Sequence, residues 1–142
     1  MPFGFHPQGK VRVILIEDSE SIRMRLAEAL SEIEHIEVIG YAETEAEAIS
    51  LLRHIGWDVA VLDLQLKAGT GIGVLKSVTP DERPPKSSII VFTHSAFPQD
   101  TDRCLQLGAQ GFFDKSRELH KLRECVRAVV ARHGAIAPAR AH

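Results

Sequence analysis

Five apolar segments recur along the chain, and an amphipathic segment with helical spacing follows each of them. The apolar segments cover residues 11–16, 36–40, 59–66, 89–92 and 111–114. The third segment is almost unbroken in apolar residues, as expected of a strand covered on both faces of a sheet. The second segment partly alternates between apolar and polar residues, which predicts an edge strand.

The amphipathic segments predict five helices. Their apolar stripes cover residues 22–33, 48–55, 72–78 and 119–130, and the fourth helix is expected at about 99–107. Ser19 is placed to cap the first helix and Ser116 to cap the last. Thr44 and Glu47 have the capping-box spacing, which predicts the start of the second helix.

Strand and helix therefore alternate five times, which predicts an α/β fold with a doubly wound parallel sheet and helices on both faces. The chain has 142 residues, of which 44% are hydrophobic and 25% are charged. These values suit one ordinary globular domain. We expect the domain over residues 11–133, a flexible N-terminal arm over 1–10 and a C-terminal tail over 134–142.

Charge and the lengths of the apolar runs narrow the class of protein. The 17 basic and 19 acidic residues give a net charge of −2, which offers no electrostatic case for binding nucleic acid or an anionic membrane. No apolar run has the length of a membrane span, and residues 1–10 do not have the pattern of a signal peptide. Cys104 and Cys125 form no C-x-x-C motif. We therefore expect a cytoplasmic protein with reduced cysteines and no membrane insertion.

An acidic residue interrupts the most apolar segment of the chain. A carboxylate such as that of Asp63 is costly in a buried strand unless charge or hydrogen bonds compensate it. Polar residues also end three other predicted strands: Glu17-Asp18, Thr93 and Lys115. Because the carboxyl ends of parallel strands meet at one rim of such a sheet, we expect these side chains to converge there.

Taken singly, these residues have structural explanations, such as helix capping by the acids or a lysine at the surface. Taken together, they indicate chemistry. Three carboxylates at one place repel one another, and a hard divalent cation such as Mg²⁺ would relieve that repulsion. With Asp63 as the nucleophile, and Lys115 and Thr93 as donors beside it, the set predicts phosphoryl transfer through an acyl phosphate.

Over roughly residues 11–133 the chain resembles the receiver domains of response regulators in two-component and phosphorelay signalling. The matching positions are Glu17-Asp18, Asp63, Gly71 in the loop that follows, Thr93, and Lys115 in Gly-Phe-Phe-Asp-Lys. The resemblance implies a flavodoxin-like (βα)5 fold of five parallel strands in the order 2-1-3-4-5. The resemblance is to a receiver of the single-domain type, which carries no output domain.

The resemblance also implies which residues hold the metal ion. Asp63 would be the phosphoacceptor, and its side chain would hold Mg²⁺ together with that of Asp18. Glu17 would help, often through water, and the backbone carbonyl of Gln65 would be a further ligand.

The function implied by the resemblance is a signalling switch. The phosphoryl group would come from a phosphohistidine of a sensor histidine kinase or a histidine phosphotransfer protein. Thr93 and the aromatic Phe112 would then reshape the face made by the fourth helix, the fifth strand and the last helix, which contacts an output protein. Such a protein is no enzyme toward other molecules, since it catalyses only its own phosphorylation and dephosphorylation.

Three positions depart from the family pattern. Lys67 and Ser116 stand where proline is common, and His94 stands where the residue after the switch hydroxyl is usually small. His94 is most simply an exposed loop histidine, although its imidazole could narrow access to the site. Gln65 and Ser95 flank the site and should influence the lifetime of the phosphoryl group.

Four alternatives stand beside this prediction. A Mg²⁺-dependent phosphatase with an aspartyl nucleophile usually needs a second aspartate two residues later, where this chain has Gln65. A flavin-binding module would have to place a phosphate beside Glu17 and Asp18, which would repel it. The chain could also be a receiver fragment of a longer regulator, or a scaffold relative that is not phosphorylated.

Overall fold

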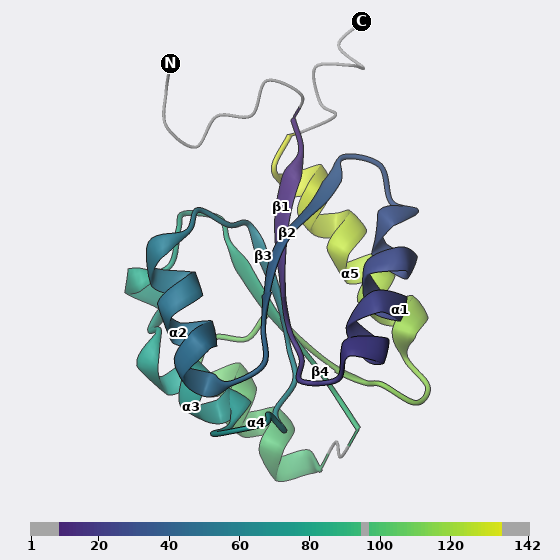
Figure 1. Cartoon of the computed structure of the whole chain (residues 1–142). Coiled ribbons are helices and arrows are strands. Elements are labelled where there is room, and N and C mark those ends of the chain that lie inside the picture. The colour runs from purple at the N-terminus through teal and green to yellow at the C-terminus, as the bar shows by residue number, and fades with distance from the viewer. Residues whose placement is uncertain (1–8, 95–96, 135–142) are drawn as a thin grey trace, which may run out of the picture.

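The computed structural model describes residues 9–94 and 97–134, and it contains one parallel five-stranded sheet in the order β2-β1-β3-β4-β5 (Figure 1). The strands are β1 (Val11–Ile16), β2 (Ile36–Ala42), β3 (Val59–Leu62), β4 (Ser88–Thr93) and β5 (Gly111–Asp114). The helices are α1 (Glu20–Ser31), α2 (Glu45–His54), α3 (Gly71–Ser77), α4 (Pro98–Gln106) and α5 (Leu119–Arg132), with a short 3-10 turn η1 at Pro80–Glu82. The predicted doubly wound fold and strand order are confirmed.

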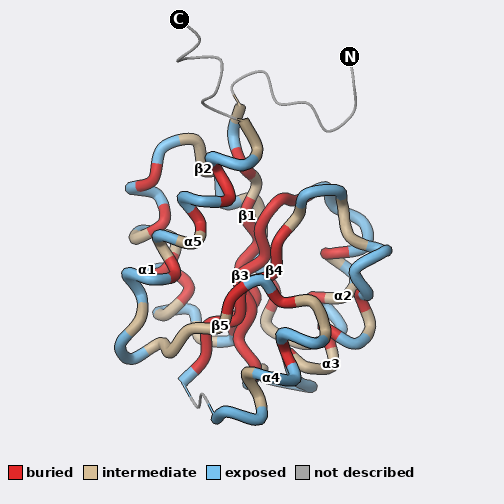
Figure 2. The backbone as a smooth tube through the Cα atoms, turned by 180° about the vertical axis from the view of Figure 1, so that it is seen from behind, coloured by how far each residue is buried: buried red, intermediate tan, exposed pale blue. Residues whose placement is uncertain are grey.

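The helices cover the sheet in two layers. In Figure 1, α1 and α5 lie on one side of the strands, and α2, α3 and α4 lie on the other. Figure 2 shows the central strands β1, β3 and β4 between them as almost wholly buried, whereas most of the edge strand β2 is not. Strand residues alternate between two cores: Ile14, Ala60 and Val91 face α2, α3 and α4, whereas Leu15 and Val61 face α1 and α5. Burial on both faces explains why the central strands are continuous apolar runs.

The predicted strand 59–66 is too long, because β3 ends at Leu62. The Asp63 amide still donates to the Ile16 carbonyl oxygen at 3.0 Å, but the chain then turns. Gln65 forms an isolated antiparallel bridge with Thr70, which closes the turn before α3. Asp63 therefore lies just after the strand, at the rim of the sheet.

The helix starts agree with the predicted caps in two of three cases. Ser19 Oγ accepts from the Ile22 amide at 3.3 Å, and Thr44 Oγ1 accepts from the Glu47 amide at 3.1 Å. Ser116 does not cap the last helix, which begins only at Leu119. Its hydroxyl instead donates to Asp114 Oδ1 at 2.5 Å, because a turn separates β5 from α5.

One smaller expectation is wrong, and others cannot be compared with the structure. Ile55 was expected on the buried stripe of the second helix, but α2 ends at His54 and the Ile55 side chain is exposed. The arm was expected over residues 1–10 and the tail over 134–142; residues 1–8 of that arm, 135–142 of that tail and the flanking residue Ser95 lie outside the described residues. Among the helices that are described, none has the length and apolar character to cross a membrane.

Candidate functional site

Four strand ends bring the predicted site residues together at one rim of the sheet. Glu17 and Asp18 follow β1, Asp63 follows β3, Thr93 ends β4 and Lys115 follows β5. Because β1, β3, β4 and β5 are neighbours and all run the same way, side chains far apart in sequence converge. The structure thus places all five predicted groups in one cluster.

The Asp63 carboxylate accepts hydrogen bonds on both of its oxygens. Thr93 Oγ1 donates to Oδ1 at 2.8 Å, and the Gln65 amide donates to the same oxygen at 3.2 Å. Lys115 Nζ donates to Oδ2 at 2.7 Å. Asp63 is buried, with 6% of its surface exposed, so these donors supply the compensation that a carboxylate in this position requires.

Lys115 joins two buried carboxylates, because Nζ also donates to Glu17 Oε1. Burial alone would lower the pKa of Lys115, but its hydrogen bonds to Asp63 and Glu17 outweigh burial and raise that pKa above its ordinary value. Burial raises the pKa of Glu17, and this effect exceeds the opposing hydrogen bonds from Lys115 and from the Ser19 amide. The lysine therefore stays a cation at the centre of the cluster.

The three acids of the rim have the composition of a site for a hard divalent cation. One carboxylate oxygen each from Glu17, Asp18 and Asp63 lies within 4.8 Å of the others. Glu17 and Asp63 are buried while Asp18 is exposed, so the group opens to solvent on the Asp18 side. A set of oxygen donors without nitrogen or sulfur fits Mg²⁺, which keeps several waters and needs few protein ligands.

The raised pKa of Glu17 makes a pH prediction. Between its ordinary pKa and its raised value, Glu17 binds more protons in the folded chain than in the unfolded chain. Its contribution to the free energy of unfolding therefore increases as pH falls through this range. We expect the stability of the wild type, relative to Glu17→Gln, to rise as pH falls from neutrality toward the ordinary pKa of Glu17, measured by urea unfolding. A relative stability that falls on acidification would contradict the prediction.

Gly71 sits where the backbone of the acceptor loop leaves no room for a side chain. A Cβ at this position would lie 2.4 Å from the Asp63 carbonyl oxygen and 2.9 Å from the Leu64 Cα. We expect Gly71→Ala to lower the free energy of unfolding by about 1–3 kcal/mol, because rigid backbone must move. Urea unfolding measures the loss. The control is Gly40→Ala, whose Cβ would meet Leu51 Cδ2 at an ordinary 3.6 Å, and an equal loss in both variants would argue against a tight fit at Gly71.

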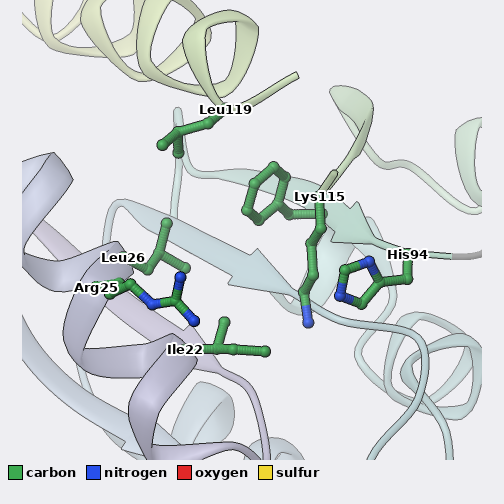
Figure 3. A pocket seen from close by; sticks show the side chains of 7 residues that line it. Ile22, Arg25, Leu26, His94, Lys115 and Leu119 are labelled. Carbon is green, nitrogen blue, oxygen red and sulfur yellow. The ribbon is translucent and has the colours of Figure 1, made fainter. Parts of the chain in front are cut away.

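A pocket of about 190 Å³ lies beside Lys115, between α1 and the ends of β4 and β5. It is lined by Ile22, Arg25, Leu26, Phe92, His94, Lys115 and Leu119. Figure 3 shows Arg25 and His94 on either side of the Lys115 side chain. His94 is exposed, as expected of a loop histidine, and it lines this pocket together with Lys115.

The remaining predicted positions lie around this cluster. Gln65 is exposed and Phe112 is half-buried against the core on the α2, α3 and α4 side. Lys67 is exposed, and its amide donates to the Glu43 carbonyl oxygen at 3.1 Å. Where the family often has a proline after the lysine, Ser116 follows a trans peptide, since residues 9–94 and 97–134 contain no cis bond.

Sequence reasoning missed Arg23, a buried cation on the first turn of α1. Its Nη1 donates to the Glu17 carbonyl oxygen at 2.8 Å and to Glu43 Oε2 at 3.0 Å. A basic residue on the apolar side of the first helix, one position after Ile22, was the signal that could have found it.

Comparison with known proteins identifies the family. Residues 13–127 match the response regulator receiver domain, and the chain belongs to this family of two-component signalling proteins. The chain is 31% identical over 118 residues to the transcriptional regulatory protein LiaR of Bacillus subtilis, which covers 83% of this chain and 55% of LiaR. It is 30% identical over 114 residues to a protein-glutamate methylesterase/protein-glutamine glutaminase of Methanospirillum hungatei, which covers 80% of this chain and 33% of that protein. The chain thus spans about half or less of these two relatives.

Solved structures agree with this assignment. The signal receiver domain of NarL from Mycobacterium tuberculosis superposes with a TM-score of 0.75 at 27% identity, over 86% of this chain and 97% of that domain. The response regulator domain of CheB from Thermotoga maritima superposes with a TM-score of 0.73 over 87% of this chain and 96% of that domain. At 20% identity, the second likeness shows the fold alone.

Proposed function

We propose that this receiver domain is a phosphoacceptor switch and that Asp63 is the residue that receives the phosphoryl group. The observation that carries the proposal is the pair of donors on the Asp63 carboxylate, Thr93 Oγ1 at 2.8 Å and Lys115 Nζ at 2.7 Å. A hydroxyl and an ammonium that already face this carboxylate are suited to donate to phosphoryl oxygens added to it.

The phosphoryl donor is a phosphohistidine of a sensor histidine kinase or of a histidine phosphotransfer protein. A carboxylate oxygen of Asp63 attacks phosphorus, and the new O–P bond forms as the N–P bond of the phosphohistidine breaks. The imidazole nitrogen leaves with the bonding electron pair. Lys115 remains protonated and offers its charge to the phosphoryl oxygens, and Thr93 offers its hydroxyl.

The acidic cluster is the proposed site for Mg²⁺. The side chains of Glu17, Asp18 and Asp63, together with the Gln65 backbone carbonyl, would hold the ion. Bound Mg²⁺ would neutralise negative charge that accumulates on the phosphoryl oxygens. The exposed Asp18 side of the cluster is where solvent and a phosphoryl donor can reach it.

The proposed output is protein contact through the face made by α4, β5 and α5. Thr93 and Lys115 are linked across β4 and β5 by the Lys115 amide, which donates to the Thr93 carbonyl oxygen at 2.9 Å. A shift of Thr93 toward a phosphoryl group would therefore act on β5, which carries the half-buried Phe112. Phosphorylation would change the populations of two arrangements of this face.

The proposal places the domain in the cytoplasm and gives it no catalysis beyond its own phosphorylation and dephosphorylation. Direct contact with nucleic acid is not part of the proposal, because a net charge of −2 gives no overall electrostatic attraction to phosphate backbones. The transcriptional role in the name of LiaR is not proposed for this chain, because the match covers only 55% of LiaR.

Incubation with acetyl phosphate and Mg²⁺, followed by intact-mass measurement, tests the proposal. We expect the wild type to gain the mass of one phosphoryl group and Asp63→Asn to gain none, and we expect a chelator to prevent the gain. Asp58→Asn is the matched control, because Asp58 is also buried but lies at the opposite ends of the strands. No gain in the wild type, or an equal gain in Asp63→Asn, would refute the proposal.

A further inference from the structure

Arg23 carries a buried charge for which the phosphoacceptor chemistry has no use. Its side chain is 10% exposed and pairs with Glu43 Oε2 at 3.0 Å. The Tyr41 ring packs against the guanidinium, with its centroid 4.1 Å from Cζ. A buried guanidinium that loses a partner costs free energy. The folded state therefore favours positions of the contacted groups that keep these partners in place.

Arg23 contacts the backbone of the acidic loop. Nη1 donates to the Glu17 carbonyl oxygen at 2.8 Å, in a buried hydrogen bond. On the other side of the same residue, the Glu17 amide donates to the Ala42 carbonyl oxygen at 2.9 Å. Both backbone polar groups of Glu17 are therefore fixed, and the peptide that joins Glu17 to Asp18 has a set orientation.

Glu43 connects this arrangement to the loop after Asp63. Its carboxylate pairs with Arg23, and its carbonyl oxygen accepts from the Lys67 amide at 3.1 Å. The next turn is tied in the same way, because the Thr70 amide donates to Glu45 Oε1 at 2.9 Å. The β2–α2 loop thus holds the two loops that carry the carboxylates of the rim.

We propose that Arg23 is a positioning residue that sets the affinity of the rim for a divalent cation by holding the Glu17–Asp18 peptide. The inference rests on the proposed function, since it concerns the same acidic cluster of Glu17, Asp18 and Asp63. Arg23 touches none of the three carboxylates in the described contacts and acts through the backbone alone.

Positioning and simple electrostatics make opposite predictions for this residue. A cation near the cluster repels Mg²⁺, so an electrostatic role alone means that Arg23→Gln binds Mg²⁺ more tightly. A positioning role means that Arg23→Gln binds it more weakly, because the loop loses its anchor. Outer partners that orient metal ligands typically contribute 10–100-fold to affinity, and we expect roughly a tenfold loss for a contact through the backbone.

Isothermal titration of the purified chain with MgCl₂ measures this effect, with circular dichroism to verify folding. Arg23→Lys keeps the charge without the planar fork, and we expect a loss between those of wild type and Arg23→Gln. Glu43→Gln keeps the Arg23 contact to Glu17 and serves as the milder second variant, with a smaller loss. The matched control is Arg12→Gln, which removes another partly buried guanidinium. Arg12 Nε pairs with Asp58 Oδ2 at a distance of 3.2 Å, and this ion pair is not part of the rim.

We expect Arg12→Gln to lower stability without changing Mg²⁺ affinity. Equal or tighter Mg²⁺ binding by Arg23→Gln, or an equal loss of Mg²⁺ affinity in Arg12→Gln, would overturn the positioning role. Neither result would affect the phosphoacceptor proposal. If Arg23→Gln weakens Mg²⁺ binding but the wild type gains no phosphoryl mass, the phosphoacceptor proposal fails and the positioning role stands. A wild type that binds no Mg²⁺ overturns both the positioning role and the proposed metal site.

Discussion

Replacement of Lys115 by methionine is expected to lower the free energy of unfolding by about 3 kcal/mol. Methionine keeps the length of the side chain but removes the ammonium that donates to Glu17 Oε1 and Asp63 Oδ2. Two buried carboxylates would then face each other without a cation, and removal of one partner from a buried pair typically costs 3–5 kcal/mol. The low end applies because the cluster opens to solvent at Asp18.

Urea unfolding with and without Mg²⁺ measures this loss. We expect Mg²⁺ to restore more stability to Lys115→Met than it adds to the wild type, because the ion would replace the missing positive charge. Lys121→Met is the matched control: Lys121 is exposed on α5 and pairs only with Glu118, at 3.0 Å, among its described ion pairs. Its loss should stay below about 0.5 kcal/mol, and a similar loss in both variants would contradict a buried role for Lys115.

Trp57→Ala is expected to lower the free energy of unfolding by about 3–5 kcal/mol. Trp57 precedes β3, is fully buried, and belongs to the core that faces α2, α3 and α4. Its indole Nε1 donates to the Leu52 carbonyl oxygen at 3.0 Å, which joins the last turn of α2 to the segment that leads into β3. Alanine would leave a large cavity and remove that hydrogen bond.

Circular dichroism during urea unfolding measures the loss, because Trp57 is the single tryptophan and its fluorescence disappears with it. Trp57→Phe should cost less, since most of the volume remains and the hydrogen bond alone is lost. Ile55→Ala is the control on the same turn, where the side chain is 43% exposed. A loss for Trp57→Ala no larger than that for Ile55→Ala would refute the prediction.

The sequence sufficed for the fold and for the members of the rim. Continuous apolar runs predicted strands buried on both faces, and parallel strands align their carboxyl ends. Asp63, Thr93 and Lys115 could therefore be brought together from positions far apart in the chain, as the structure has them. The family match over residues 13–127 agrees with the predicted class.

Features that depend on local geometry were not predictable in the same way. The strand before Asp63 was expected to continue to residue 66, because Leu64 and Leu66 are apolar, but they turn toward the core from a loop. Ser116 has the right residue type for a helix cap, yet a carboxylate two residues earlier, Asp114, takes its hydroxyl. Arg23 bonds a backbone carbonyl, which no residue pattern records.

The long sequence separation within the charge cluster has a kinetic consequence. Lys115 lies 98 residues from Glu17 and 52 residues from Asp63, whereas transition states for folding favour contacts that close short loops. We infer that these ion pairs form after the rate-limiting step, so that Lys115→Met would accelerate unfolding and leave the refolding rate nearly unchanged. Stopped-flow rates over a range of urea concentrations would test this, and slower refolding would contradict it. The cluster would then slow unfolding and so set the lifetime of the folded state, without affecting how fast the chain folds.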